Sequence, residues 1–159
     1  MKHLIIGLLF CNLFSAQSNV DFTEIFKNDT NYFEGKKDEK QQVKFKFDSV
    51  YSNNQDEYFV EGIAEIIDEI SSVSGKINFN KKETKKFRNP SMYNFDVVLN
   101  IGKESDQTKV FKGQLNIKMI PKIFNVIVFE GIYQNENGKD PMQFDNSEQI
   151  MKYLESLKK

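Results

Sequence analysis

The chain has 159 residues, a formal charge of −1 at pH 7, and 15 Phe and 6 Tyr but no Trp. This length predicts a single domain that buries a hydrophobic core of its own. The near-zero charge argues against a general nucleic-acid surface, and the sequence contains no nucleic-acid recognition motif. The aromatic-rich composition favours β structure.

Residues 1–17 have the three parts of a secretory signal peptide and resemble the signal peptides of Bacteroidetes-type bacteria. Lys2 is followed by an apolar run over Leu4–Phe14 and by the small-residue exit Ser15–Gln17. The run of about 11 apolar residues is too short for a membrane span, which takes roughly 20. We therefore expect an exported, periplasmic or extracellular protein with one β-rich domain over residues 18–159 and no stable membrane span.

The signal segment contains the only Cys, Cys11, and the only His, His3. One alternative is an outer-membrane lipid anchor on Cys11, but Phe10 stands where a lipidation motif has a small residue. After cleavage near Ala16 or Gln17, the mature chain has neither residue type, which excludes disulfides, Ser-His-Asp or Cys-His catalysis, and His/Cys sites for zinc or copper. Glycine-rich phosphate motifs are also missing. We expect no cofactor.

The early chain predicts a short helix followed by strands. Asp21–Lys27 fits one or two helical turns with Asp21 as a plausible N-cap. Tyr32–Gly35 begins a β region, and Lys36–Lys40 is a charged turn. A strand follows, in which apolar and polar residues alternate, with these apolar positions: Val43, Phe45 and Phe47.

Glu57–Ser74 has features of both helix and strand. Its apolar residues match helical spacing, but Gly62 weakens a helix by roughly 1 kcal/mol relative to Ala, and the Ile content favours a strand. We interpret it as a strand that bends near Ser71–Ser72 into a second strand, Gly75–Asn80, with a helix as the alternative. The basic run Lys81–Arg88 is then either an anion-binding or surface-binding loop or, as we expect, a solvated connection.

The second half of the chain predicts a hairpin and a terminal helix. After a strand over Tyr93–Ile101 and a turn over Gly102–Thr108, Lys109–Tyr133 reads as two strands about a break at Pro121 and Lys122. Asn135–Pro141 reads as a long turn. Residues 147–157 predict a helix with an apolar stripe: Ile150, Met151, Leu154 and Leu157.

These elements predict a mainly β fold, a curled antiparallel sheet or up-and-down barrel of about 7–8 strands with a C-terminal helix. An aromatic residue or Val two places before a Gly recurs along the strands, as is typical of curved sheets, at Gly35, Gly62, Gly75, Gly113 and Gly131. The order of elements is similar to that of lipocalin-like (calycin) barrels. The resemblance is architectural; the family's opening Gly-x-Trp is missing, and Tyr32–Gly35 is its loose counterpart. It implies a terminal helix that packs outside the barrel.

The leading hypothesis is a non-enzymatic binding protein whose interior is either a packed core or a site for a small apolar ligand. The candidate lining, considered as core first, is Phe45, Phe47, Phe95, Val97, Leu99, Phe111, Leu115, Ile117 and Phe129. The alternative is an interaction or inhibitor module that binds an envelope or extracellular protein through sheet edges or the segments Lys81–Arg88 and Asn135–Pro141.

A third hypothesis, a carboxylate-based hydrolase, depends on four clustered acidic residues: Glu61, Glu65, Asp68 and Glu69. If their segment is a strand, Glu61, Glu65 and Glu69 share one face. Alternation with Ile is what a solvated strand face produces, so we assign no catalytic residue. The oxygen donors Asp140, Asp145, Asn146 and Glu148 miss the EF-hand spacing, so we assign no metal site.

Overall fold

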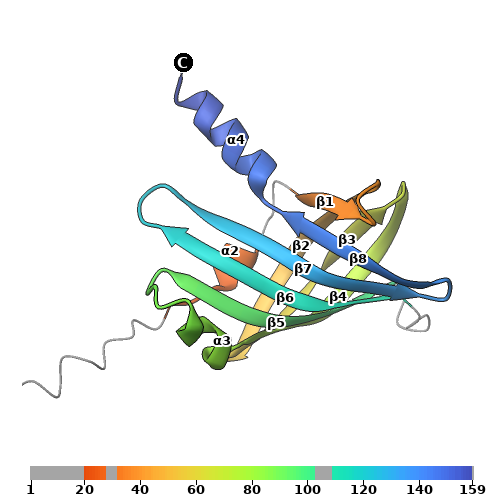
Figure 1. The fold of residues 1–159 in the computed structure, drawn as a ribbon, viewed down its shortest axis with the longest axis horizontal. Coiled ribbons are helices and arrows are strands. Elements are labelled where there is room, and N and C mark those ends of the chain that lie inside the picture. Colours follow the sequence, from red (N-terminus) through yellow and green to blue (C-terminus); the bar gives the residue numbers. More distant parts are fainter. Residues whose placement is uncertain (1–19, 28–31, 103–108, 159) are drawn as a thin grey trace, which may run out of the picture.

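The computed structural model describes residues 20–27, 32–102 and 109–158. In these residues eight antiparallel strands form a closed barrel in chain order, with β1 also paired to β8 (Figure 1). The strands are β1 (Phe33–Lys37), β2 (Gln41–Asn54), β3 (Glu57–Ile66), β4 (Glu69–Phe79), β5 (Met92–Ile101), β6 (Lys109–Ile120), β7 (Phe124–Asn135) and β8 (Gly138–Asp145). The predicted fold class is thereby confirmed. The expected signal segment, with Cys11, and most of the Gly102–Thr108 turn lie outside the described residues.

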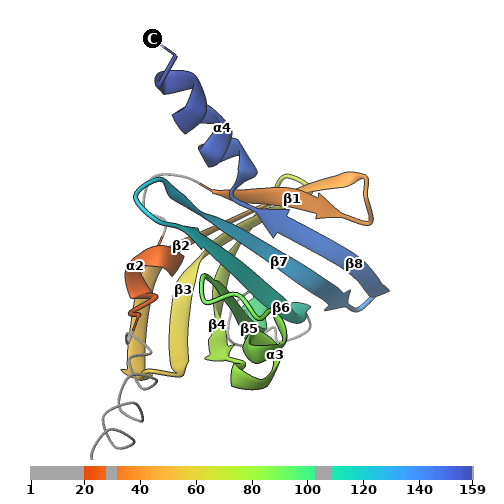
Figure 2. The same cartoon turned by 60° about the vertical axis from the view of Figure 1, so that its left-hand side comes forward.

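Three helices lie at one end of the barrel, which we call the helical end (Figure 2). They are α2 (Thr23–Phe26), α3 (Lys81–Lys86) and α4 (Ser147–Ser156). Because successive strands are antiparallel, the connections after β2, β4, β6 and β8 all fall at this end. The turns after β1, β3 and β7 lie at the opposite, far end. Among the described residues no helix has the length and apolar character needed to cross a membrane.

Alternation along the strands places one apolar set inside the barrel, as the sequence predicted. Val43, Phe45 and Phe47 are at most 1% exposed, whereas the residues between them are less deeply buried. The expected hairpin about Pro121 is the β6–β7 pair, and the short helix expected within Asp21–Lys27 is α2. Burial of these inward faces supplies the main driving force for closing the sheet.

The five glycines of the recurrent pattern lie in strands at points of close backbone approach. Gly113 on β6 pairs with Gly131 on β7. A Cβ built on Gly131 would lie 2.6 Å from the Gly113 Cα, and a Cβ on Gly113 would overlap the Glu130 carbonyl oxygen. Without side chains, the two strands can approach this closely where the wall curves.

Each end of the barrel is covered by its own residues. At the helical end Phe26 of α2 is fully buried and meets Tyr58 and Phe95 edge to face, with ring centroids 5.0 and 5.3 Å apart. At the far end the Lys37 ammonium lies 2.9 Å from the Asp140 carboxylate. It also lies 5.3 Å from the centre of the Tyr133 ring. An aromatic plug and an ion pair therefore cover the two openings.

Glu57–Ser74 is β structure, as interpreted, but it forms two strands and the predicted bend near Ser71–Ser72 is wrong. The chain turns earlier, at Ile67 and Asp68, which have φ values of 53° and 64°. A two-residue hairpin of this kind normally uses Asn-Gly or a similar pair, so Ile-Asp gives no turn signal. β4 then runs uninterrupted from Glu69 to Phe79.

Three further expectations are corrected. Lys81–Arg88 is not simply a loop, because it contains α3, whose first turn is capped by the Asn80 side chain accepting from the Glu83 N–H at 3.0 Å. The long turn over Asn135–Pro141 is only two residues long, since β8 begins at Gly138 and includes Pro141. The terminal helix matches its predicted bounds to within a residue, yet α4 buries no side chain and points away from the barrel instead of packing along it (Figure 1).

Candidate functional site

All nine predicted lining residues lie inside the barrel, each at most 1% exposed. Three of their rings, those of Phe45, Phe111 and Phe129, pack against that of Phe144 from β8. Phe144 stacks on Phe45 at 4.2 Å and on Phe129 at 4.5 Å between ring centroids. None of the nine lines any of five hollows found along the described chain. In this structure they form the hydrophobic core.

A hollow of about 440 Å³ lies at the helical end between α2 and α3, and we call it the α2–α3 hollow. Its apolar side is made of half-buried or buried side chains from separate segments: Val20, Phe22, Phe79, Met92 and Tyr93. Phe22 lies 4.9 Å from both Tyr93 and Phe95 between ring centroids. Since Phe95 belongs to the core, the floor of the hollow is the outer layer of the packed interior.

Four residues of the basic run form the other side of the hollow: Lys81, Thr84, Lys85 and Arg88. Their spacing of i, i+3, i+4 and i+7 places them on one helical face. Arg88 follows the C-cap residue Phe87 and has φ of 50°, the left-handed region where glycine is normally found after a helix. The spacing was visible in the sequence, but it carries meaning only once the run is known to be helical.

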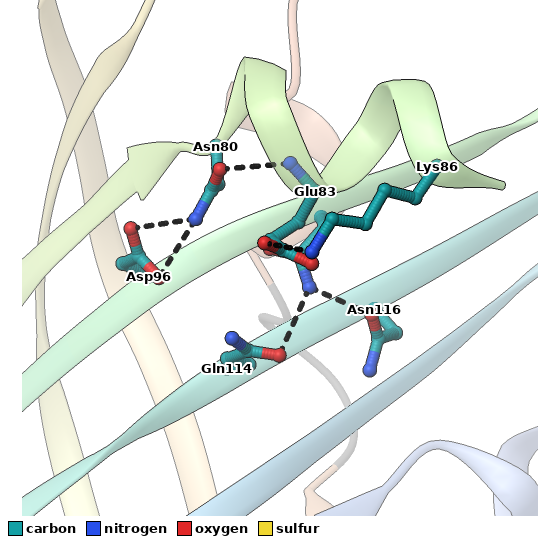
Figure 3. Close-up of polar contacts among 7 residues, drawn as sticks. Asn80, Glu83, Lys86, Asp96, Gln114 and Asn116 are labelled. Atoms are coloured by element: carbon teal, nitrogen blue, oxygen red, sulfur yellow. Dashed lines mark hydrogen bonds and ion pairs between the residues drawn. The ribbon is translucent and has the colours of Figure 1, made fainter.

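Hydrogen bonds to β5 of the barrel wall hold α3 in place, and further bonds join β5 to β6 beneath it (Figure 3). The Asn80 Nδ2 donates to both carboxylate oxygens of Asp96, at 3.2 and 3.0 Å. The Asn94 backbone N–H donates to the Thr84 hydroxyl at 2.8 Å. The buried Asn94 side chain donates to Gln114 and Asn116 on β6, at 3.3 and 2.9 Å. These bonds hold the basic face of α3 toward the hollow.

The charges that line the α2–α3 hollow are unequal. Three cationic side chains stand against one carboxylate, Asp56, giving a formal charge of +2. Lys81 is already paired with Asp56, with 2.8 Å between its ammonium and the carboxylate. Within the described residues Lys85 and Arg88 make no ion pair, so they set the electrostatic character of the hollow.

Tyr58 ties α2 to the barrel beside the hollow. Its hydroxyl accepts from the Phe22 N–H at 3.5 Å and donates to the Gln55 carbonyl at 3.3 Å. Burial, opposed by the Phe22 hydrogen bond, raises the pKa of Tyr58, so this side chain stays neutral at physiological pH. Tyr58 therefore holds the segment before α2 in place beside the hollow and adds no charge there.

The acidic cluster considered for hydrolysis does not converge. Glu65 lies on the outside of β3, 3.3 Å from the Lys44 ammonium. Glu69 begins β4 opposite the buried Ile66 and lies 2.8 Å from Lys109. The prediction that Glu61, Glu65 and Glu69 share a face is therefore wrong for Glu69, because the chain turns before it. The remaining member, Asp68, lies in that turn.

The oxygen donors considered for calcium are likewise separated. Asp140 lies at the far end with Lys37, whereas Asn146 bridges to β7, accepting from the Ile127 N–H at 2.9 Å and donating to the Asn125 carbonyl at 2.7 Å. The Asp145 carboxylate accepts from the Ser147 N–H at 2.8 Å. Within the described residues no three His, Cys, Asp or Glu side chains come together as a metal site.

Glu148 at the start of α4 interacts with Glu34 on β1. Partial burial, together with a hydrogen bond to Glu148 and its negative charge, raises the pKa of Glu34. The hydrogen bond from Glu34, with help from Lys152, lowers the pKa of Glu148. The pair lies at the base of α4, on the outer surface of the barrel.

A second hollow, of about 520 Å³, lies at the base of α4. Tyr153 meets Phe124 edge to face at 6.4 Å between ring centroids, and Gln149 donates to the Tyr32 carbonyl at 2.9 Å. Its charged lining residues, Glu24 and Lys27, balance each other. Beyond this contact the apolar stripe of α4 is open, with Met151 56% and Leu157 64% exposed.

No protein-family model, curated protein or solved structure matches this chain. The site must therefore be interpreted from its own chemistry. The α2–α3 hollow combines an apolar floor with two cations that make no ion pair within the described residues. Such an arrangement is suited to binding.

Proposed function

We propose that this chain is an exported, non-enzymatic binding protein of lipocalin-like architecture that binds a small apolar molecule in the α2–α3 hollow. The observation that carries the proposal is the hollow itself. Its volume of about 440 Å³ lies in the range of small-molecule sites, and aromatic and aliphatic side chains form its floor. Because the barrel interior is filled by its own rings, the binding surface lies outside the core.

The signal segment supports export, and the closed barrel with a short helix at its base supports the resemblance to lipocalin-like proteins. In this proposal the barrel is a rigid scaffold that positions Phe79 and Tyr93 at the ends of β4 and β5. A site on rigid elements loses little entropy when it binds. Mass spectrometry of the protein recovered from outside the cytoplasm tests the proposed export, and we expect a new N-terminus near Ala16 or Gln17.

Fluorescence of 1-aminoanthracene, a small aromatic probe, tests the binding site. Met92→Gln replaces part of the apolar floor with an amide that the aromatic probe would bury without a hydrogen-bond partner, so we expect at least a tenfold loss of probe affinity. Met151→Gln is the matched control, because Met151 lies on exposed α4. Equal binding by both variants, at unchanged melting temperature, would disprove the proposed site.

A protein-interaction module is the second candidate function, favoured by α4. The helix leaves Met151, Leu154 and Leu157 exposed although they form one apolar stripe. An envelope or extracellular protein that buries this stripe would lose affinity when Leu154 and Leu157 are changed to Ser. Affinity capture with the parent protein and this double variant distinguishes a specific partner from background.

A further inference from the structure

We propose that the α2–α3 hollow recognises an amphipathic anion, a molecule with one apolar part and one negatively charged head group. The head group is held by Arg88 and Lys85, and the apolar part lies on Phe79, Met92 and Tyr93. This inference rests on the proposed function, because it names the chemical class of the ligand for the same hollow.

Charge distinguishes this hollow from the others. Of the five hollows compared along the described chain, it is the one with a net positive lining. The hollow at the base of α4 is balanced, and the remaining three carry more carboxylates than cations. The whole molecule has a formal charge of −1, whereas this apolar hollow carries two cations that make no ion pair within the described residues. Such a feature attracts anions.

The neighbouring lysines show which cations are available. Lys81 is paired with Asp56 at 2.8 Å, and Lys86 is paired with Glu83 at 2.6 Å. Lys85 and Arg88 have no such carboxylate within the described residues, and both line the hollow. A guanidinium offers five N–H donors in a planar fork that matches a carboxylate, sulfate or phosphate group. Arg88 is the only Arg in the sequence.

The backbone at Arg88 makes glycine the appropriate test substitution. Its φ of 50° is a conformation that costs a non-glycine residue energy, and glycine at this position would remove the strain. A cation after the last helical turn also interacts favourably with the helix dipole, and glycine gives up that interaction. Arg88→Gly therefore removes the cation with little net change in the stability of the helix end.

Displacement of 1-aminoanthracene by decanoate and by decan-1-ol tests the inference. The two compounds share an alkyl chain and differ in the charged head group. We expect decanoate to bind about tenfold more tightly than decan-1-ol, and raising the salt concentration to weaken decanoate alone. Arg88→Gly should lower decanoate affinity about tenfold, leave decan-1-ol affinity unchanged, and keep or raise the melting temperature. Lys85→Gln should lower decanoate affinity about threefold.

Lys139→Gln is the control, because Lys139 is an exposed lysine near the far end of the barrel. Equal affinities for decanoate and decan-1-ol, unaffected by Arg88→Gly, would overturn this inference and leave the proposed function standing. Failure of the probe and both compounds to bind would overturn both. Phosphatidylglycerol vesicles test a membrane source of the same head group. If the protein co-sediments with these vesicles only when Arg88 is present, and does not bind decanoate, the inference of a free amphipathic ligand is contradicted.

Discussion

Truncation of Phe144 to Ala distinguishes a packed core from the lining of an open cavity. Phe144 lies between two parallel rings, with interplanar angles of 14° to Phe45 and 13° to Phe129, and 5.2 Å from Phe111 between ring centroids. Removing a buried Phe side chain costs about 3–5 kcal/mol, of which the cavity left behind is a part. Each stacked pair adds roughly 0.5–1.5 kcal/mol beyond area burial. We therefore expect Phe144→Ala to lower the free energy of unfolding by about 4 kcal/mol.

Urea unfolding followed by far-ultraviolet circular dichroism measures this loss. Leu157→Ala is the control, because Leu157 is 64% exposed on α4, and its truncation should change the free energy of unfolding by no more than about 0.5 kcal/mol. A side chain that borders solvent-filled space leaves no new cavity when it is shortened. A loss below about 1.5 kcal/mol at Phe144 would therefore refute the packed interior.

Three further predictions test the wall, the terminal helix and the acidic pair. Gly113→Ala places a methyl group 2.7 Å from the Gly131 Cα, so β6 and β7 must separate by about 1 Å, at a cost of roughly 3 kcal/mol in the free energy of unfolding. The control Lys112→Ala, at an outward position, should cost under about 0.5 kcal/mol in the same urea titration. Equal effects of the two substitutions would contradict the close approach of the strands. Ending the chain at Asn146 removes α4, which buries no side chain, so we expect the free energy of unfolding of the barrel to fall by about 1 kcal/mol or less. A cooperative loss of β structure in circular dichroism would show that the barrel needs α4 to fold. The pKa of Glu34 is raised above its ordinary value of 4.5, so its protonated form adds stability that is fully present below that value and lost as the pH rises through the folded pKa. Glu34→Gln should therefore raise the melting temperature at neutral pH and lose this advantage in acid. The same gain at every pH would contradict the raised pKa of Glu34.

The sequence predicted the structure well where the pattern of neighbouring residues alone determines which side chains are buried. Alternation at Val43, Phe45 and Phe47 predicts an inward face wherever the strand pairs, and the helix predicted over residues 147–157 begins at Ser147 as α4 does. The Ile67-Asp68 turn was missed because its positive φ values are imposed by the pairing of β3 with β4, against the preference of Ile. Local signals therefore located the strands better than the turns between them.

The candidate site depended on contacts that a linear pattern does not contain. Phe22, Phe79 and Tyr93 meet because the register of β4 with β5 brings their chain segments to one end of the barrel. The helix over Lys81–Lys86 was missed since a run of lysines has weak periodicity, and its cap depends on Asn80. Phe144 was missed because Pro141 suggested a turn where β8 already runs.

The central claim is that the barrel interior is a filled core and that ligand binds outside it, at the helical end. Two-dimensional NMR of the protein titrated with decanoate tests this most directly. We predict shifts at the Met92 methyl group and the Phe79 and Tyr93 rings, with the Phe45, Phe129 and Phe144 rings unchanged. Shifts or intermolecular contacts centred on those three interior rings would contradict it.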